Sequence, residues 1–484
     1  MLYKRSDTWR NLDWWTVLMY LVLVVAGWFT ICGASYDFES GVFFAATGRP
    51  ASQLMWIGVS LAAAFIILML DRDFFEVYSY LIYGAVMVLL VATIFLAGDI
   101  KGSGSWLVIG PIRLQPAEFA KFATALALAR TLSVYGFRVT RFKDFMTVAG
   151  LILLPMIAII LQREAGSALV FLAFFLVLYR EEMPGYLLFA GICMVAFFVL
   201  EIKFSGAMLW ETTPEGEFWV TLLILVIETV LVILAQRNAV AARIILLVIG
   251  LSFLAGGLVQ YFIPGTINFV WICLTLILGL FIYLSILALR KRMLQFFVLG
   301  LCGLLAVGYL YSVDYVFDEI LEPHQQTRIR VALGMEDDPS GAGYNVDQSL
   351  VAIGSGGFSG KGFLNGTQTK LSYVPEQETD FIFCTVGEEF GFIGTSLVLL
   401  LFTALILRLF IIAERQPNIF GRAYGYAVGS IFLFHVMVNI GMVIGLIPVI
   451  GIPLPFFSYG GSSLLGFTIL LFILLQLDAN RKSR

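Results

Sequence analysis

The sequence predicts an all-α polytopic membrane protein. Of its 484 residues, 60% are hydrophobic and only 13% are charged, and the mean hydropathy is +0.93. Soluble domains carry about 25% charged and about 45–50% apolar residues, so this composition indicates a lipid environment. Apolar runs long enough to span about 30 Å of hydrocarbon recur along the chain. Because lipid offers no hydrogen-bond partners to the backbone, we expect each run to be a helix.

We count about fourteen such runs. They lie near residues 14–33, 54–70, 78–97, 115–131, 145–162, 166–181, 185–203, 218–236, 241–262, 267–290, 294–312, 388–412, 422–447 and 463–478. Basic residues Lys4, Arg5 and Arg10 precede the first run. That run is longer than the apolar core of a cleaved signal, so we expect a retained first helix that starts in the cytosol.

Basic residues test this count, because cytoplasmic loops are enriched in Lys and Arg. With the N-terminus inside and an even number of helices, the basic loops all fall on the cytosolic side; they lie within 130–143, 237–243, 290–292, 408–422 and 480–484. The same topology places the polar segments 99–113, 313–378 and 448–461 outside. The segment 313–378 is too long for a mere connector, so we expect the chemistry on this outer face.

Several function classes are disfavoured by the composition. A net charge of −3 gives no reason to expect nucleic-acid binding. The five cysteines lack metal or disulfide spacing, and two histidines are too few for a histidine-based metal centre. The glycine cluster Gly354–Gly362 is not a Walker loop, because Ser355 and Gly362 stand where that motif needs Gly and Ser or Thr. We expect it to form turns.

Asp380 is the main candidate for a functional residue. It lies where the long polar segment re-enters an apolar run, and acids near membrane depth mark functional sites by default. The run 448–463 carries three prolines and three glycines between two predicted helices. Irregular backbone at membrane depth is tolerated only where it is buried or lines a cavity. We therefore predict a re-entrant loop beside Asp380.

Further charged residues accompany these segments. Glu118 and Lys121 share one helix face, and they form either a purely structural intramembrane ion pair or part of the lining of a substrate cavity. Glu164 lies in a sharp outer turn that suggests a cavity rim. Of Glu388 and Glu389, we expect one to cap a helix start and the other to be a buried polar partner.

The motifs resemble those of the SEDS family (shape, elongation, division and sporulation). They are Gln115-Pro-x-Glu118-x-x-Lys121, Tyr344-x-x-x-Gln348-Ser, Gly366-Thr-Gln-Thr369, Pro375-Glu-x-x-Thr-Asp-Phe-Ile-Phe383, Gly387-Glu-Glu389, Asn439-x-Gly-Met442, Gly451-Ile-Pro-Leu-Pro-Phe456 and Ser458-Tyr-Gly-Gly-Ser462. The resemblance covers residues 14–203 and about 294–478 and is closer to the RodA-like elongation branch than to the FtsW-like division branch.

The resemblance implies a ten-helix core and divides the chain into three parts. Residues 1–203 and 294–484 correspond to the two parts of the core, and the large extracytoplasmic loop 313–378 precedes the third-last helix. Residues 204–293 have no family counterpart and are expected to add about four transmembrane helices. An even number keeps Asp380 outside.

The resemblance also implies a peptidoglycan glycosyltransferase of the bacterial cytoplasmic (inner) membrane, active in elongation and cell shape. Its substrate would be lipid II, the undecaprenyl-pyrophosphate-linked disaccharide-pentapeptide, polymerised on the extracytoplasmic face. The essential aspartate of the family falls on Asp380, and its acid–lysine pair falls on Glu118 and Lys121. A class B penicillin-binding protein would supply the transpeptidase, together with other membrane proteins of the elongation complex.

Two departures from the family pattern bear on the site. Gln162-Arg-Glu164 replaces the usual Gln-Pro-Asp, and Glu378 replaces a histidine two residues before the aspartate. Two acids so close repel each other when both are ionised, so one of them is expected to hold its proton more tightly, which suits a base. Alternatively, a divalent cation such as Mg²⁺ or Mn²⁺ bridges Asp380 and Glu378. No cofactor is required by the pattern.

The residues are compatible with glycosyl transfer. Such a reaction needs a base at the acceptor hydroxyl and positive charge at the leaving pyrophosphate. We expect Asp380 to be the base, giving inversion to a β-1,4 linkage. The expected cations are Arg328, Arg330, Lys361 and Lys370, and Ser458 is expected to line the substrate cavity. The rival interpretation is a lipid II flippase, since broken helices and intramembrane charges are typical of transporters.

Overall fold

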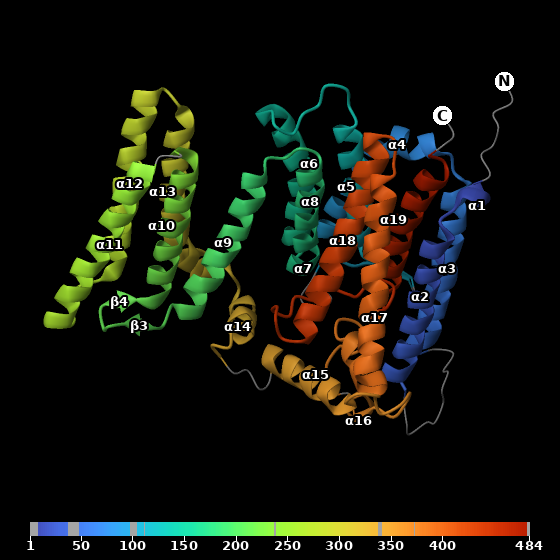
Figure 1. Ribbon diagram of the computed structural model, residues 1–484. Helices are drawn as coiled ribbons and strands as arrows, with labels where there is room; N and C mark the ends of the chain where they lie inside the picture. Colours follow the sequence, from blue (N-terminus) through green and yellow to red (C-terminus); the bar gives the residue numbers. More distant parts are fainter. Residues whose placement is uncertain are drawn as a thin grey trace. The chain divides into compact units, whose positions relative to one another are not determined.

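The computed structural model describes residues 8–36, 48–96, 104–110, 112–236, 239–336, 341–371 and 373–481. These ranges are mostly helical, and their strands form two short antiparallel hairpins. The chain divides into two compact units. Unit 1 comprises Met1–Gly185 with Pro339–Arg484, and unit 2 comprises Tyr186–Asp338. Each is described by itself (Figure 1).

Unit 1 begins with the helices that precede unit 2 in the sequence. They are α1 (Thr8–Asn11), α2 (Trp14–Ala34), α3 (Arg49–Met69), α4 (Arg72–Leu96), α5 (Pro116–Leu132), α6 (Phe142–Leu161), α7 (Ala165–Leu169), the 3₁₀ turn η1 (Val170–Ala173) and α8 (Phe174–Arg180). The hairpin of β1 (Leu107–Ile109) and β2 (Ile112–Leu114) leads into α5. Pro116 occupies the first turn of α5, where its missing N–H is no loss.

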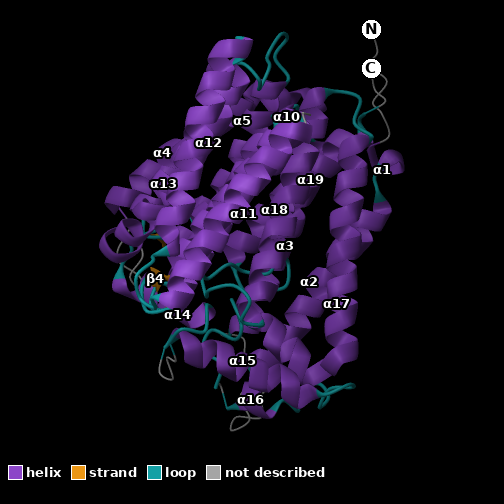
Figure 2. Ribbon diagram, turned by 60° about the vertical axis from the view of Figure 1, so that its left-hand side comes forward, coloured by secondary structure: helices purple, strands orange, loops and turns teal. Residues whose placement is uncertain are grey.

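The second part of unit 1 contains two outer helices and three long ones. They are α15 (Ala342–Gly356), α16 (Thr367–Lys370), α17 (Ile382–Glu414), α18 (Ile419–Val443) and α19 (Gly461–Ala479). The long helices of unit 1 run side by side along a common direction (Figures 1 and 2). Helix α17 starts earlier than the predicted run 388–412, because Glu388 and Glu389 look like a charged boundary in the sequence but are buried in the structure.

The core of unit 1 lies around α5, α18 and α19. Most side chains of these three helices are buried. Helix α19 packs against α3 and α5, and α18 packs against α5 and α17. Polar residues carried by α5 and α18 are therefore held inside the helix bundle and away from lipid.

Unit 2 consists of helices and one short hairpin. They are α9 (Gly185–Phe204), α10 (Glu215–Gln236), α11 (Ala239–Phe262), α12 (Phe269–Lys291), α13 (Leu294–Tyr315), the π-helical turn η2 (Val316–Ile320) and α14 (Pro323–Ala332). The hairpin of β3 (Met208–Leu209) and β4 (Thr213–Pro214) joins α9 to α10. Apolar side chains from α10, α12 and α13 form the largest hydrophobic cluster of this unit.

The helices agree with the predicted membrane spans. Twelve helices of the described ranges are long and apolar enough to cross a membrane. All fourteen predicted runs fall on helices, the other two being α5 and the shorter apolar stretch Ala165–Arg180. The chain is therefore a multi-pass helical membrane protein. The segment 204–293 contains three long helices, α10 to α12, so an inserted set of four has to include α9 or α13.

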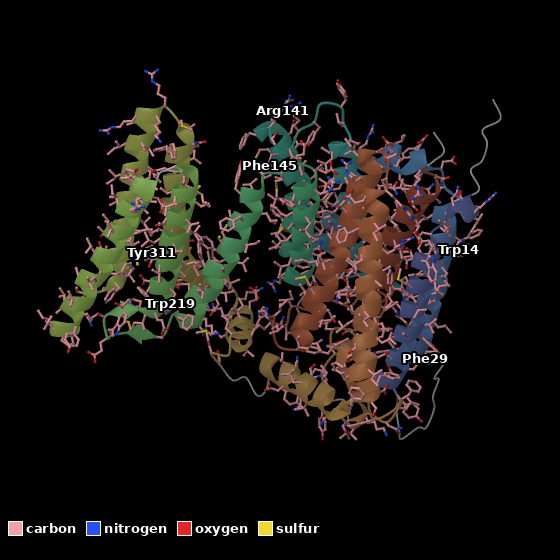
Figure 3. The ribbon with its side chains drawn as sticks, in the orientation of Figure 1. Trp14, Phe29, Arg141, Phe145, Trp219 and Tyr311 are labelled. Atoms are coloured by element: carbon pink, nitrogen blue, oxygen red, sulfur yellow. The ribbon has the colours of Figure 1, made fainter. Side chains whose placement is uncertain are left out.

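The two ends of unit 1 differ as the topology predicts. Trp14, Arg141 and Phe145 lie toward one end and Phe29 lies toward the other (Figure 3). Helices α15 and α16 lie toward the Phe29 end (Figure 1). The basic loop around Arg141 and the polar segment before α17 are thus on opposite faces. Parts of the predicted polar and basic segments lie outside the described residues. They are 99–103 and 111 of the segment 99–113, 337–340 and 372 of the long loop, Lys4, Arg5, Arg237 and 482–484.

Candidate active site

Asp380 is half-buried in the turn that leads into α17. The backbone on either side of it is fixed by three hydrogen bonds from the C-terminal part of the chain. Each of three successive carbonyls accepts one bond: Glu378 O from Tyr459 N (2.8 Å), Thr379 O from Ser458 Oγ (2.6 Å) and Asp380 O from Asn439 Nδ2 (2.8 Å). The carboxylate is thus carried on a backbone that has little freedom to shift.

The predicted re-entrant loop is present beside Asp380. Residues 444–460 are irregular, connect α18 to α19 and are mostly buried or half-buried. Asn439 Nδ2 also donates to Ile452 O at 2.7 Å, so one amide joins the loop to the aspartate turn. Gly451 has φ +71°, and a Cβ placed on it would lie 3.3 Å from Asp380 Oδ2. The carboxylate therefore faces the backbone of the re-entrant loop.

Glu378, the departure from the family histidine, forms an ion pair with Arg49 at the start of α3. The Arg49 guanidinium also lies 5.9 Å from the centre of the Tyr459 ring, and its side chain is 52% exposed. A cation bridging Glu378 and Asp380 would have to displace this guanidinium. In the described ranges no group of three or more His, Cys, Asp or Glu side chains could hold a metal ion. The donor set therefore fits a metal ion poorly, and the bridging cation stays a prediction.

Glu118 and Lys121 form a buried ion pair with Nζ and Oε1 2.7 Å apart. Lys121 Nζ also lies 3.0 Å from His435 Nε2, and the Nδ1 of that histidine lies 3.1 Å from Pro453 O. If His435 carries its proton on Nδ1, Nε2 accepts from the ammonium and every group is paired. The ion pair is thus tied to the re-entrant loop. A lining role in a substrate cavity stays a prediction.

Glu164 stands directly before α7. Its Oε1 accepts a hydrogen bond from Ser105 Oγ at 2.7 Å, and its charge acts on Lys121. A Cβ on Gly166 would come within 2.2 Å of Ile450 O, so the start of α7 packs directly on the re-entrant loop. Glu164 therefore lies in the same region as the buried ion pair. Its place at the rim of a substrate cavity stays a prediction.

Glu388 binds the Gly366-Thr-Gln-Thr369 motif. Its fully buried carboxylate accepts hydrogen bonds from the backbone N–H groups of Gln368 (2.8 Å) and Thr369 (2.9 Å) at the start of α16. It also accepts from Lys361 Nζ at 2.8 Å. Lys361 donates in addition to the hydroxyls of Ser355 and Thr367, each at 2.7 Å. The Lys361 ammonium thus anchors the outer loop, and its predicted contact with substrate stays untested by this geometry.

The remaining predicted cations are placed differently. Lys370 is half-buried at the end of α16 and acts electrostatically on Glu389. Arg328 is exposed on α14, and Arg330 lies on the same helix in unit 2. The structure therefore brings Asp380, Glu378 and Ser458 together in unit 1. The proximity of Arg328 to Asp380 stays a prediction.

The sequence reasoning assigned no role to three residues of this site. Arg49, Asn439 and His435 all contact the aspartate turn or the buried ion pair. A signal existed for Asn439, which is a polar residue on a predicted apolar helix and belongs to a quoted motif. The sequence contains no signal for a role of Arg49, because its partner Glu378 is 329 positions away.

Comparison with known proteins agrees with this arrangement. The chain matches the cell cycle protein family FtsW/RodA/SpoVE over residues 13–210 and 189–483. It is 31% identical over 468 residues to the peptidoglycan glycosyltransferase RodA of Treponema pallidum (strain Nichols), covering 96% of this chain and 98% of that one. It is 41% identical over 182 residues to the peptidoglycan glycosyltransferase MrdB of Escherichia coli (strain K12), covering 38% and 49%.

Solved structures share the fold. One comes from work on the structural coordination of polymerization and crosslinking by a peptidoglycan synthase complex. It has a TM-score of 0.60 at 22% identity and covers 97% of this chain and 98% of that chain. The rod shape determining protein RodA of Thermus thermophilus has a TM-score of 0.54 at 22% identity, with the same coverage of both chains. The arrangement of helices is thus common to these proteins.

Proposed function

The chain belongs to the FtsW/RodA/SpoVE family, and from this membership and the geometry around Asp380 we propose how it works. It is a peptidoglycan glycosyltransferase of cell-wall synthesis and a RodA-like member of the SEDS family. The observation that carries the proposed mechanism is the position of Asp380. Its half-buried carboxylate stands on a turn whose three carbonyls are each bound by a separate residue of α18 or the re-entrant loop.

In the proposed reaction, the substrate is lipid II and Asp380 is the general base. Its carboxylate takes the proton of the GlcNAc 4-hydroxyl as that oxygen attacks the anomeric carbon of the donor MurNAc. The bond from this carbon to the pyrophosphate oxygen breaks, and the electron pair leaves with the undecaprenyl pyrophosphate. Attack from the opposite face inverts the α-linked donor to a β-1,4 linkage. A base held by neighbouring groups is expected to contribute about 10²–10⁴-fold to the rate.

The leaving pyrophosphate needs a positively charged group near it. The attraction between the two must be stronger in the transition state than in the ground state if it is to accelerate the reaction. Arg328 and Lys370 keep this role as proposals from the sequence. The structure supports adding Arg49, because its guanidinium is half exposed and lies next to the turn that carries Asp380. Glu378 would hold this guanidinium in place until a pyrophosphate competes for it.

The site is proposed to face the outside of the cytoplasmic membrane. Support comes from the position of α15 and α16 at the end of unit 1 opposite Arg141 (Figures 1 and 3). A class B penicillin-binding protein is the proposed partner, because this chain offers a polymerase and crosslinking needs a transpeptidase. Support comes from the structural neighbour described as part of a peptidoglycan synthase complex. Co-purification of the full chain with such a protein would test the pairing.

The decisive test of the mechanism is Asp380→Asn in purified protein supplied with lipid II. We expect the variant to melt at the wild-type temperature and to lose at least 10²-fold in glycan synthesis, because the amide cannot accept the proton. Glu376→Gln, an exposed acid in the same turn, is the matched control and should keep its activity. Undiminished polymerisation by Asp380→Asn would refute the role of the aspartate.

The flippase interpretation makes a different prediction. A transporter has no measurable reaction when no membrane separates two compartments, whereas a polymerase forms glycan strands in detergent. Detergent-solubilised wild-type protein should therefore convert lipid II to polymer without a bilayer. Absence of product under these conditions, with lipid II still transported in vesicles, would favour the flippase.

A further inference from the structure

Glu228 is a buried acid at membrane depth in unit 2. It lies on α10, about 20 Å from the start of the helix and about 12 Å from its end, and is 3% exposed. Its carboxylate lies against the backbone of α13, because a Cβ placed on Gly303 would be 2.5 Å from Glu228 Oε2. The buried side chains that α10, α12 and α13 contribute to this unit are mainly apolar, among them Leu225, Ile277 and Leu310.

Nothing in the described part of unit 2 neutralises a charge on Glu228. Neither carboxylate oxygen has a hydrogen-bond partner there. The cationic side chains on the helices packed against α10, namely Arg243 on α11 and Arg290 and Lys291 on α12, are exposed and form no ion pair with it. An ionised carboxylate in such a place is far less stable than a neutral one, since burial removes water and no positive charge replaces it.

A second buried acid lies nearer the β3–β4 end of the same unit. Glu201 on α9 is 3% exposed, and its Oε2 has no hydrogen-bond partner among the described residues. Asp314 on α13 and Glu217 on α10 both act on it electrostatically, and Tyr311 donates a hydrogen bond to Glu217 Oε2. Trp219 and Tyr311 mark this part of unit 2 in Figure 3. Glu217 and Glu228 are eleven residues apart, about three turns, so they lie on the same side of α10, with Glu217 half-buried and Glu228 buried.

We propose that Glu228 is a proton-binding site in the membrane interior of unit 2, and that Glu201, Glu217 and Asp314 make the β3–β4 end the side from which it exchanges protons. A metal cation would need more oxygen ligands than the one carboxylate supplies. A proton needs only one oxygen. The negative charges at the β3–β4 end raise the local proton concentration on that side of the bundle.

The chemistry of carbodiimides tests this proposal in the full-length protein. Dicyclohexylcarbodiimide is apolar and reacts with a neutral carboxylic acid: the acid proton moves to one nitrogen, and the carboxylate oxygen bonds to the central carbon. The adduct rearranges to a stable N-acylurea with no atom lost. Peptide mass spectrometry after labelling in detergent should locate the adduct on Glu228 at neutral pH, with labelling falling at alkaline pH. A water-soluble carbodiimide should not reach the site.

The controls distinguish a protonated carboxyl group from a carboxylate that is buried but ionised. Glu388 is buried as deeply but is paired with Lys361, so it should stay unlabelled. Glu228→Gln should remove the adduct; if this variant fails to fold, the location of the adduct in wild-type protein still decides the question. Wild-type protein without a Glu228 adduct, labelling that does not change with pH, or protection by Na⁺ at fixed pH would each overturn the proposal.

The exchange side has its own test. Replacing Glu217 by Gln and Asp314 by Asn removes the negative charges of two acids that are not fully buried, so the midpoint pH of Glu228 labelling should shift to lower values. Glu319→Gln, an exposed acid on η2, is the control and should leave the midpoint unchanged. An unshifted midpoint in the double variant would show that these acids do not serve Glu228. None of these outcomes depends on polymerase activity.

Discussion

Asn439 is the residue whose single side chain ties Asp380 to the re-entrant loop. Its buried Nδ2 donates to Asp380 O and Ile452 O at 2.8 and 2.7 Å. Asn439→Leu would leave two carbonyls without this donor, at a cost of about 1–3 kcal/mol in the free energy of unfolding. A displacement of the catalytic group by about 1 Å can lower the rate about 10²-fold, so activity should fall more than stability. Melting and lipid II polymerisation measure the two effects.

Asn418→Ala provides a matched comparison on the same helix. Asn418 caps the other end of α18 by accepting from Gly421 N at 3.2 Å, and its loss should cost about 1 kcal/mol. This variant should keep its polymerase activity at temperatures where it is folded. If both variants lost activity only in proportion to their loss of stability, Asn439 would be structural and nothing more.

Asp13 makes the stability of the protein sensitive to acid. Its carboxylate pairs with Arg408 at 2.7 Å and with Arg415 at 2.8 Å. Burial would raise the pKa of Asp13, but hydrogen bonds from the two guanidinium groups outweigh burial and hold the pKa below its ordinary value. A lowered pKa stabilises the fold above the unfolded value of about 3.9, and this stabilisation disappears as the pH falls through the folded pKa.

We therefore expect the melting temperature of the wild type to decline below about pH 5. The decline should be shallower in Asp13→Asn, which is already less stable at neutral pH because it has lost both ion pairs. Asp144→Asn removes an acid that accepts one exposed hydrogen bond from Arg138 N, and it should leave the wild-type pH profile intact. Identical profiles for Asp13→Asn and wild type would contradict the assignment.

The glycine cluster and the kink of α17 form one structural device. Gly391 interrupts α17 with φ +62° and ψ −156°, a conformation open almost only to glycine. The N–H groups freed there donate to Gly357 O and Phe358 O, and the freed carbonyls of Glu388 and Glu389 accept from residues 361 and 362. The expectation of turns over Gly354–Gly362 is wrong for residues 354–356, which are the last residues of α15, and the irregular residues 357–362 are the partner of the broken helix. This break lets the outer loop approach the start of α17.

Gly391→Ala tests this device. The conformation alone should cost about 1–3 kcal/mol in the free energy of unfolding, and a Cβ would also lie 2.3 Å from Gly360 N. Hydrogen exchange at residues 357–371 should rise, because the loop would lose its anchor. Gly354→Ala is the control from the same cluster: its Cβ would meet open space on α15, so we expect unchanged or slightly higher stability. Wild-type stability of Gly391→Ala would exclude the proposed strain.

At the scale of the whole molecule, the membrane-spanning helices could be predicted from the sequence, but the division of the chain into two compact units could not. Length and hydropathy predicted the long apolar helices, because crossing lipid demands long apolar runs that few other structures need, but not the short helices α1, α14, α15 and α16. The sequence gives no sign of the boundaries of unit 2 (Tyr186–Asp338), because the long helices inside and outside this unit are similarly apolar. Asp380 could be proposed as a site residue because an acid next to an apolar run is unusual in such a sequence. The groups that hold it, such as Tyr459 N and Ser458 Oγ, depend on long-range packing that no local pattern encodes.

The number of helices in the inserted region decides on which side of the membrane Asp380 lies. Deleting residues 205–293 removes three helices, α10 to α12, whereas deleting 205–315 removes four, α10 to α13. Because each crossing reverses the side, only the four-helix deletion should keep Asp380 on the outer face. We expect that deletion to retain polymerase activity and a cytosolic C-terminus, and the three-helix deletion to lose both. Accessibility of a C-terminal cysteine in intact cells measures the topology. An active three-helix deletion would mean that the deleted segment crosses the membrane an even number of times, so that at least one of α10 to α12 does not cross it.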